Sequence, residues 1–198
     1  MQRRDGGADR VIWRRFRADG DCYVRLRQGA LFVARVAAVA ERAVDLAHSL
    51  AGELDPLVDV RIDDQRRGLV WGARELPRAD VRDALTRLKL PLATYGGAEL
   101  SLITPTDQLT VTADLLLFAV GRTDRWWRAL DRFGLRAQRR ILEPQWMPAP
   151  GPPRPVRDLS DAIDVAVQQL ELQRESARGA DGSRGVASGE GPRVVSSA

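Results

Sequence analysis

Few side chains in this sequence could support catalysis, and they are scattered. The only histidine, His48, and the only cysteine, Cys22, are far apart in the chain. Cys22 alternates with Val24, which predicts a small buried residue and not a nucleophile. With no second histidine or cysteine, we expect neither a zinc site nor a Cys–His pair. We therefore predict no catalytic residue, no metal ligand and no cofactor site.

Paired carboxylates are the other groups that could perform acid–base chemistry. They occur as Asp19/Asp21 and Asp63/Asp64, and both pairs lie in expected hairpin turns, where aspartate commonly bonds its own backbone. Asp114 interrupts an apolar run and is expected to form a structural ion pair. An enzyme with a carboxylate site, or with a site shared between subunits, is therefore the third and weakest hypothesis.

Arginine and aromatic side chains offer a different chemistry, the recognition of phosphates and bases. They are expected on the outer face of a sheet and in an adjoining turn, at Tyr23, Arg25, Arg27, Arg61, Arg66 and Arg67. Asp59 and Asp63 alternate with arginine on the same face, a pattern more typical of a solvated surface. Nucleic-acid binding is therefore the second hypothesis.

Two segments indicate contact with another protein. Trp126 and Trp127 are adjacent, so they cannot share one helix face, and tryptophan is enriched at interfaces. Further along, one apolar stripe at helical spacing follows a Pro-rich segment: Leu159, Ile163, Val167 and Leu170. Such a helix either folds back on its own domain or docks on a partner. Our first hypothesis is a non-catalytic protein-binding or assembly module whose partner is another protein or a second copy.

The elements that would position these residues follow a repeated order. Hairpins are expected at 11–28, 57–76 and 99–120, and helices at 30–50, 80–90 and 125–133, in the order ββα, ββα, ββα. This order predicts an α+β fold, with a largely antiparallel sheet of about six strands and helices on one face. The strand Leu109–Val120 becomes apolar on both faces, so we place it at the centre of the sheet, with Leu115, Leu117 and Phe118 buried.

Composition divides the chain and limits its class. We expect a flexible N-terminus over 1–9, an α+β domain over 10–146, a Pro-rich linker over 147–156, an amphipathic helix over 157–175 and a disordered tail over 176–198. Charges interrupt the longest apolar stretch, so no membrane span is expected. The single cysteine, and a first stretch without a signal peptide's apolar core, favour a cytoplasmic location. Lys89 is the only lysine and asparagine is absent, a habit typical of a GC-rich bacterial genome.

Overall fold

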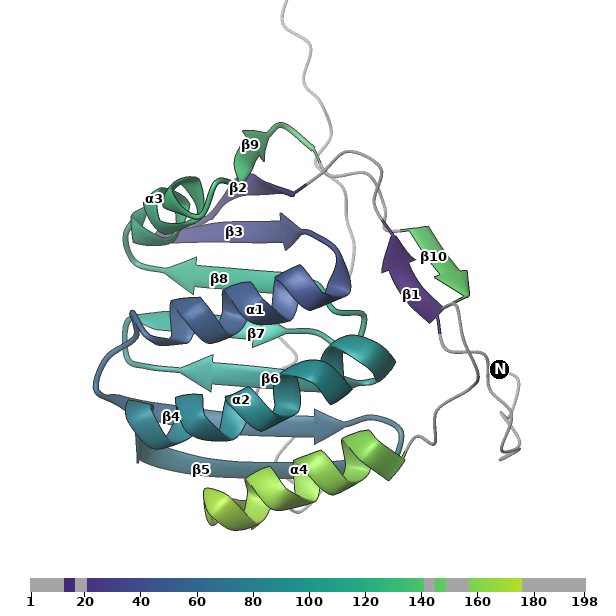
Figure 1. Ribbon diagram of the computed structural model, residues 1–198. Helices are drawn as coiled ribbons and strands as arrows, with labels where there is room; N and C mark the ends of the chain where they lie inside the picture. Colours follow the sequence, from purple (N-terminus) through teal and green to yellow (C-terminus); the bar gives the residue numbers. More distant parts are fainter. Residues whose placement is uncertain (1–12, 17–20, 141–144, 149–156, 176–198) are drawn as a thin grey trace, which may run out of the picture.

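A nine-stranded mixed sheet forms the centre of the protein, in a computed structural model that describes residues 13–16, 21–140, 145–148 and 157–175 (Figure 1). Its strand order is β11-β5-β4-β6-β7-β8-β3-β2-β9, and every pairing is antiparallel except that of β2 with β9. The strands of this sheet are β2 Cys22–Gln28, β3 Leu31–Ala37, β4 Leu57–Asp64, β5 Leu69–Pro77, β6 Ala98–Ile103, β7 Asp107–Val111, β8 Leu117–Gly121, β9 Arg136–Gln138 and β11 Gln173–Arg174. The α+β prediction is confirmed, but the sheet has more strands than the six expected.

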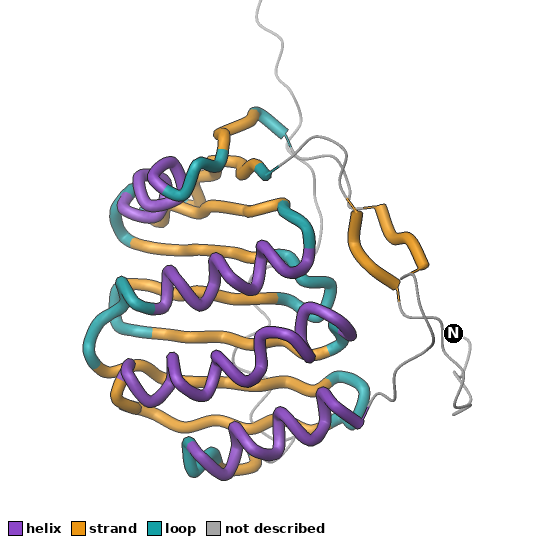
Figure 2. Tube along the Cα trace, in the orientation of Figure 1, coloured by secondary structure: helices purple, strands orange, loops and turns teal. Residues whose placement is uncertain are grey.

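The described helices lie on one face of this sheet (Figure 2). They are α1 Ala40–Ala51, α2 Arg78–Tyr95, α3 Arg125–Arg132 and α4 Arg157–Gln169. Helices α1 and α2 bury one apolar stripe each, for example Leu46 and Leu50 on α1 and Leu85 and Leu88 on α2. Opposite them lie the inward residues of the central strands, so the core is a single layer between helices and sheet.

The expected helix over 30–50 is wrong in its first half. Residues 31–37 form strand β3, which pairs with β2 on one side and β8 on the other, and the helix begins only at Ala40. Phe32, Val36 and Val39 fit a helical spacing, but residues 32–37 also contain two valines and are apolar on both faces except at Arg35. A strand between two others needs that composition, so the pairing of β3 outweighs its helical periodicity.

The third unit also differs from the expected hairpin and helix, because three strands precede α3. A tight turn at 112–116 separates β7 from β8, with Leu115 N donating to Thr112 O at 2.8 Å and Leu115 at φ 59°. Leu115 is buried as predicted, but in the turn and not in a strand. Leu117 is fully buried on β8, whereas Phe118 faces away from the helices and is only half-buried.

Two further boundaries were predicted wrongly. The first described strand, β1 Trp13–Phe16, pairs with β10 Gln145–Pro148 in a separate two-stranded sheet and not with β2. Helix α2 continues through Pro91 to Tyr95, because Leu92 and Ala93 are buried against the core and outweigh the hydrogen bond that proline cannot donate. The expected flexible residues 1–9, most of the 147–156 linker and the 176–198 tail lie outside the described residues.

The C-terminal segment lies at one edge of the sheet. The buried side chains of α4 and its continuation are Leu159, Ile163, Ala166, Leu170 and Leu172. They pack on the same core as α2, and β11 then pairs with β5. Within the described part of the chain, no helix is long and apolar enough to cross a membrane.

Candidate functional site

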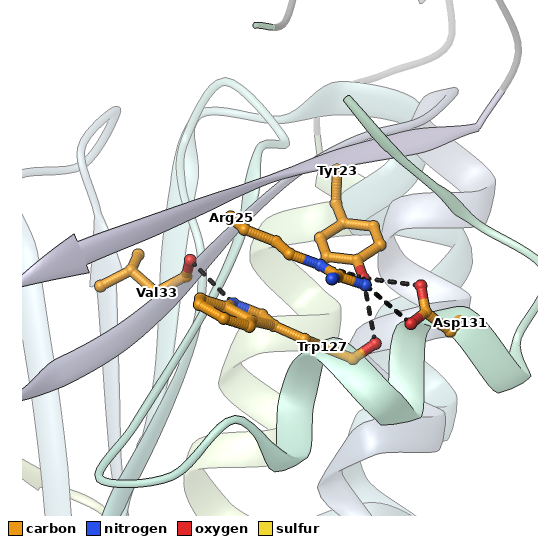
Figure 3. Close-up of polar contacts among 5 residues, drawn as sticks. All are labelled: Tyr23, Arg25, Val33, Trp127 and Asp131. Carbon is orange, nitrogen blue, oxygen red and sulfur yellow. Dashed lines mark hydrogen bonds and ion pairs between the residues drawn. The ribbon is translucent and has the colours of Figure 1, made fainter. Parts of the chain in front are cut away.

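Helix α3 packs at the opposite end of the sheet, against β8, β3 and β9, and one polar network joins it to β2 (Figure 3). The Tyr23 hydroxyl lies 2.6 Å from Asp131 Oδ1 and accepts hydrogen bonds from Arg25 Nε and Nη2 at 3.0 and 2.7 Å. Arg25 Nη2 also donates to Asp131 Oδ2 at 2.8 Å. A hydroxyl has one proton, and the short distance identifies the Asp131 carboxylate as its acceptor.

Tyr23 and Arg25 keep their protons near neutral pH, because the pKa of each is raised. Burial raises the pKa of Tyr23, and its hydrogen bond to Asp131 raises it further. The hydrogen bond to Tyr23 raises the pKa of the Arg25 guanidinium, with further support from the charge of Asp131. Neither group can therefore accept a proton as a general base near pH 7. The geometry positions α3 on the sheet and holds Arg25 in place.

The two tryptophans of α3 are anchored to the sheet. Trp126 is buried and its indole N–H donates to Val120 O at 3.1 Å. Trp127 is half-buried and donates to Val33 O at 3.1 Å (Figure 3), and its ring meets Phe32 edge-on at 5.1 Å between centroids. As predicted from their adjacency, they occupy different directions, but Trp126 offers no surface to a partner.

Beside helix α3, the hairpin of β2 and β3 is exposed at its tip. Arg27 lies over the Phe32 ring, with its guanidinium carbon 4.1 Å from the centroid, and makes no ion pair with any described residue. Leu26 is 44 % exposed and Leu31 is 37 % exposed. Because side chains alternate along a strand, these leucines point to the face without helices, whereas Arg25 and Arg27 lie on the face of α3.

The outer edge of β2 is covered only in part. Strand β9 pairs with Cys22, Tyr23 and Val24, and no described strand continues beyond that point. Arg136 N donates to Asp21 O, so the outward backbone groups of β2 belong to its odd-numbered residues. The N–H and C=O of Arg27 are therefore directed toward the outer edge. We call Arg25 to Leu31 the hairpin edge.

The six residues predicted to bind nucleic acid do not share one face. Tyr23 is fully buried, while Arg25 and Arg27 lie on the helix side of β2. Arg61 lies on β4, on the face without helices, where Glu175 Oε2 is 3.3 Å from its Nε; three strands separate β4 from β3 in the sheet.

Arg66 and Arg67 lie in the β4–β5 turn around Asp64, which is fully buried. Asp64 accepts both of their backbone N–H groups, as expected for a turn aspartate. Arg67 also reaches Asp164 on α4 at 2.9 Å, so this arginine fastens α4 to the turn.

The apolar stripe predicted for partner docking is covered by the protein's own domain. Leu159, Ile163 and Leu170 are buried, and Val167 packs against the core at intermediate exposure. The Tyr95 hydroxyl donates to Asp158 and Gln169 donates to Asp83, which adds polar contacts along the α2–α4 seam. Docking of this helix is thus intramolecular in the structure.

The residues considered for catalysis lie apart. His48 Nε2 is 3.1 Å from Thr86 Oγ1, and burial, with Lys89 and Arg82 nearby, lowers its pKa. Cys22 is buried, Asp21 pairs with Arg42 and Asp114 is an exposed turn residue; Asp19 lies outside the described residues. Among the residues the structure describes, no three of His, Cys, Asp or Glu are grouped closely enough to hold a metal ion.

Sequence reasoning missed the residues that shape the hairpin edge. Phe32 falls in the range expected to be helical, 30–50, and forms part of β3. The alternation of Cys22 and Val24 continues to Leu26, which would place Leu26 on the buried face, but Leu26 is exposed. Tyr23 was assigned to the wet face and is fully buried. Asp131, at i+4 from Trp127 on the expected helix, was the one available signal for a polar contact on the same helix face.

Comparison with known proteins gives no relative to transfer a function from. No protein-family model, no curated protein and no solved structure gives a significant match to the chain.

Proposed function

We propose that this protein is a non-catalytic protein-binding module that holds its partner with the hairpin edge. The observation that carries the proposal is the juxtaposition of two exposed leucines, Leu26 and Leu31, with a strand edge that β9 leaves open beyond Val24. Sheet edges normally end in short strands or charged covers, and an uncovered apolar edge is a site for pairing with another chain.

The rest of the described sheet agrees with this role. At the far edge β11 pairs with Trp71 and Gly72 of β5, whereas the exposed Leu26 and Leu31 lie in the hairpin at the other edge. The network of Tyr23, Arg25 and Asp131 holds α3 against the hairpin, which keeps the edge rigid and lowers the entropy lost on binding.

Affinity capture with matched variants tests the proposal. The full chain would be used to capture proteins from a lysate of its own host, in parallel with Leu26→Lys/Leu31→Lys and with Leu57→Lys/Leu90→Lys as control. Leu57 and Leu90 are at least as exposed, at 51 % and 63 %, but lie away from the hairpin edge. We expect a captured protein to be lost with the first pair and kept with the second. Equal capture by both variants, with both folded by circular dichroism, would refute the proposal.

Nucleic-acid binding is the second candidate, and one observation favours it. Arg136, Arg139 and Arg140 are exposed in and after β9 and, like Arg27, make no ion pair with described residues. Such charge would give salt-dependent affinity for phosphates without sequence preference. A gel-shift assay with mixed DNA and RNA tests this: we expect no shift at physiological salt. A sub-micromolar shift whose salt dependence flattens in Arg139→Ala/Arg140→Ala would make nucleic acid the preferred partner.

A further inference from the structure

We infer that the partner segment is an extended stretch of alternating acidic and apolar residues, which adds to the sheet as a strand alongside β2. The inference rests on the proposed function, because it assumes that the hairpin edge is the binding surface. It adds the chemistry of the partner. Backbone hydrogen bonds to β2 align the partner segment as a strand, and the two faces of the sheet beside β2 select its side chains.

The first step is the backbone. Beyond Val24 the outer groups of β2 include the N–H and C=O of Arg27, and no described strand pairs with them. An incoming strand bonds both groups of such a residue, as β9 does for the preceding part of β2. The strand would continue the row of β9 toward the β2–β3 turn, so a segment of only a few residues fits.

The second step is the helix-side face. A strand beside β2 has every second side chain on the side of Arg25 and Arg27. Arg25 is already engaged by Asp131 and Tyr23, whereas the Arg27 guanidinium is stacked on Phe32 and makes no ion pair with described residues. Stacking leaves the N–H groups at the rim of the guanidinium available, and a carboxylate matches that fork in a bidentate contact. Side chains on this face are therefore acidic.

The third step is the opposite face. The intervening side chains of the added strand would lie beside Leu26 on β2, and Leu31 lies on the same face one strand further in, on β3; both leucines are exposed. Covering these leucines removes apolar surface from water, which favours apolar partner side chains. Alternation of the two faces along a strand then gives the acidic–apolar period of two.

A second copy of this chain does not fit the edge. Pairing of β2 with β2 about a two-fold axis would put the side chains of Arg25 and Arg27 opposite the same arginines of the partner. Like charges directly opposite each other destabilise a strand pair. The nearby exposed side chains of Arg136, Arg139 and Arg140 would add to the repulsion.

A peptide titration tests the inference on the full chain. The probe is a blocked peptide of about eight residues, the length of an ordinary strand, that alternates glutamate and valine. Two comparison peptides keep the length: one alternates lysine and valine, and one has the glutamates and valines in separate blocks. Binding would be followed by amide shifts in NMR spectra and by hydrogen exchange at Arg27.

We expect the alternating acidic peptide to bind, to slow exchange of the Arg27 amide, and to lose affinity about tenfold in Arg27→Ala, the loss of one charged contact. Arg74→Ala, which removes an exposed arginine on β5, should leave the affinity unchanged. If the peptide with its glutamates and valines in separate blocks, or the lysine peptide, bound equally well, the inference of an alternating acidic and apolar partner would be wrong. A faster-sedimenting species of the protein alone, lost in Leu26→Lys/Leu31→Lys, would show that a second copy, and not a peptide, occupies the hairpin edge.

The two proposals can fail separately. If no acidic peptide binds but capture of a host protein still depends on Leu26 and Leu31, the partner chemistry is wrong and the binding edge stands. If capture is insensitive to both leucines, the proposed function fails, whatever the peptides do.

Discussion

The intramolecular docking of α4 gives the sharpest test of the fold, because the same helix carries a buried and an exposed aliphatic residue. Ile163 is 1 % exposed and packs on the core shared with α2, whereas Val165, two residues later, is 41 % exposed. Truncating a buried isoleucine to alanine costs about 2–5 kcal/mol, since it removes buried methyl groups and leaves a cavity. An exposed aliphatic side chain changes stability by no more than about 0.5 kcal/mol.

We therefore expect Ile163→Ala to lower the free energy of unfolding by about 2–5 kcal/mol, or Tm by about 4–20 °C for a chain of this size, and Val165→Ala to change it little. Urea denaturation of the full chain, followed by tryptophan fluorescence and by circular dichroism, measures both variants. Coincident transitions would show that α4 unfolds with the domain. Equal stability of the two variants, together with rapid hydrogen exchange over 159–170, would refute docking on the protein's own domain and free this helix for a partner.

Three further predictions concern the sheet. Leu117→Ala should cost about 2–5 kcal/mol and Phe118→Ala less, because Leu117 is fully buried and Phe118 is half-buried; equal losses in urea denaturation would contradict their different faces. Burial and the facing carboxylate of Asp63 raise the pKa of Glu99, so folding favours the protonated form of this side chain. The stability that protonated Glu99 contributes is present below its unfolded pKa, near 4.5, and is lost as the pH rises through its folded pKa. Glu99→Gln should accordingly be more stable than the wild type by about 0.2–1 kcal/mol at pH 7, and by less near pH 4. An unchanged or lower Tm of the variant at pH 7 would argue against repulsion between Glu99 and Asp63. Tyr23→Phe should cost about 1 kcal/mol, the loss of a hydroxyl that joins two charged groups, while keeping the folded spectrum; a neutral effect would show that the network adds no stability.

Predicting the candidate site from the sequence required knowing which side chains of β2 lie on the buried face of the sheet and which on the exposed face. The alternation in β2 correctly separated Arg25 and Arg27 from Val24, but which face was buried depended on α3. Once α3 covers Tyr23, the face expected to be wet becomes partly buried, whereas Leu26 on the opposite face is 44 % exposed. Since α3 follows β2 by about a hundred residues, no local pattern carries that information.

Local signals by themselves determined the class of this protein. Period-two runs bounded by turn residues located strands β4 and β5. Period-3.6 stripes located helices α2, α3 and α4, with other bounds, because each pattern needs only one buried face and neighbours in the chain. An α+β fold follows from their order.

Only the tertiary structure decided the rest. Residues 31–37 are apolar enough for either a helix or a buried strand, and their pairing with both β2 and β8 selects the strand. The α4 stripe was compatible with docking on its own domain or on another chain, and its contacts with α2 decide for its own domain. Both choices depend on partners far away in the sequence, and the free energy of burying apolar surface is gained only when those partners are in place.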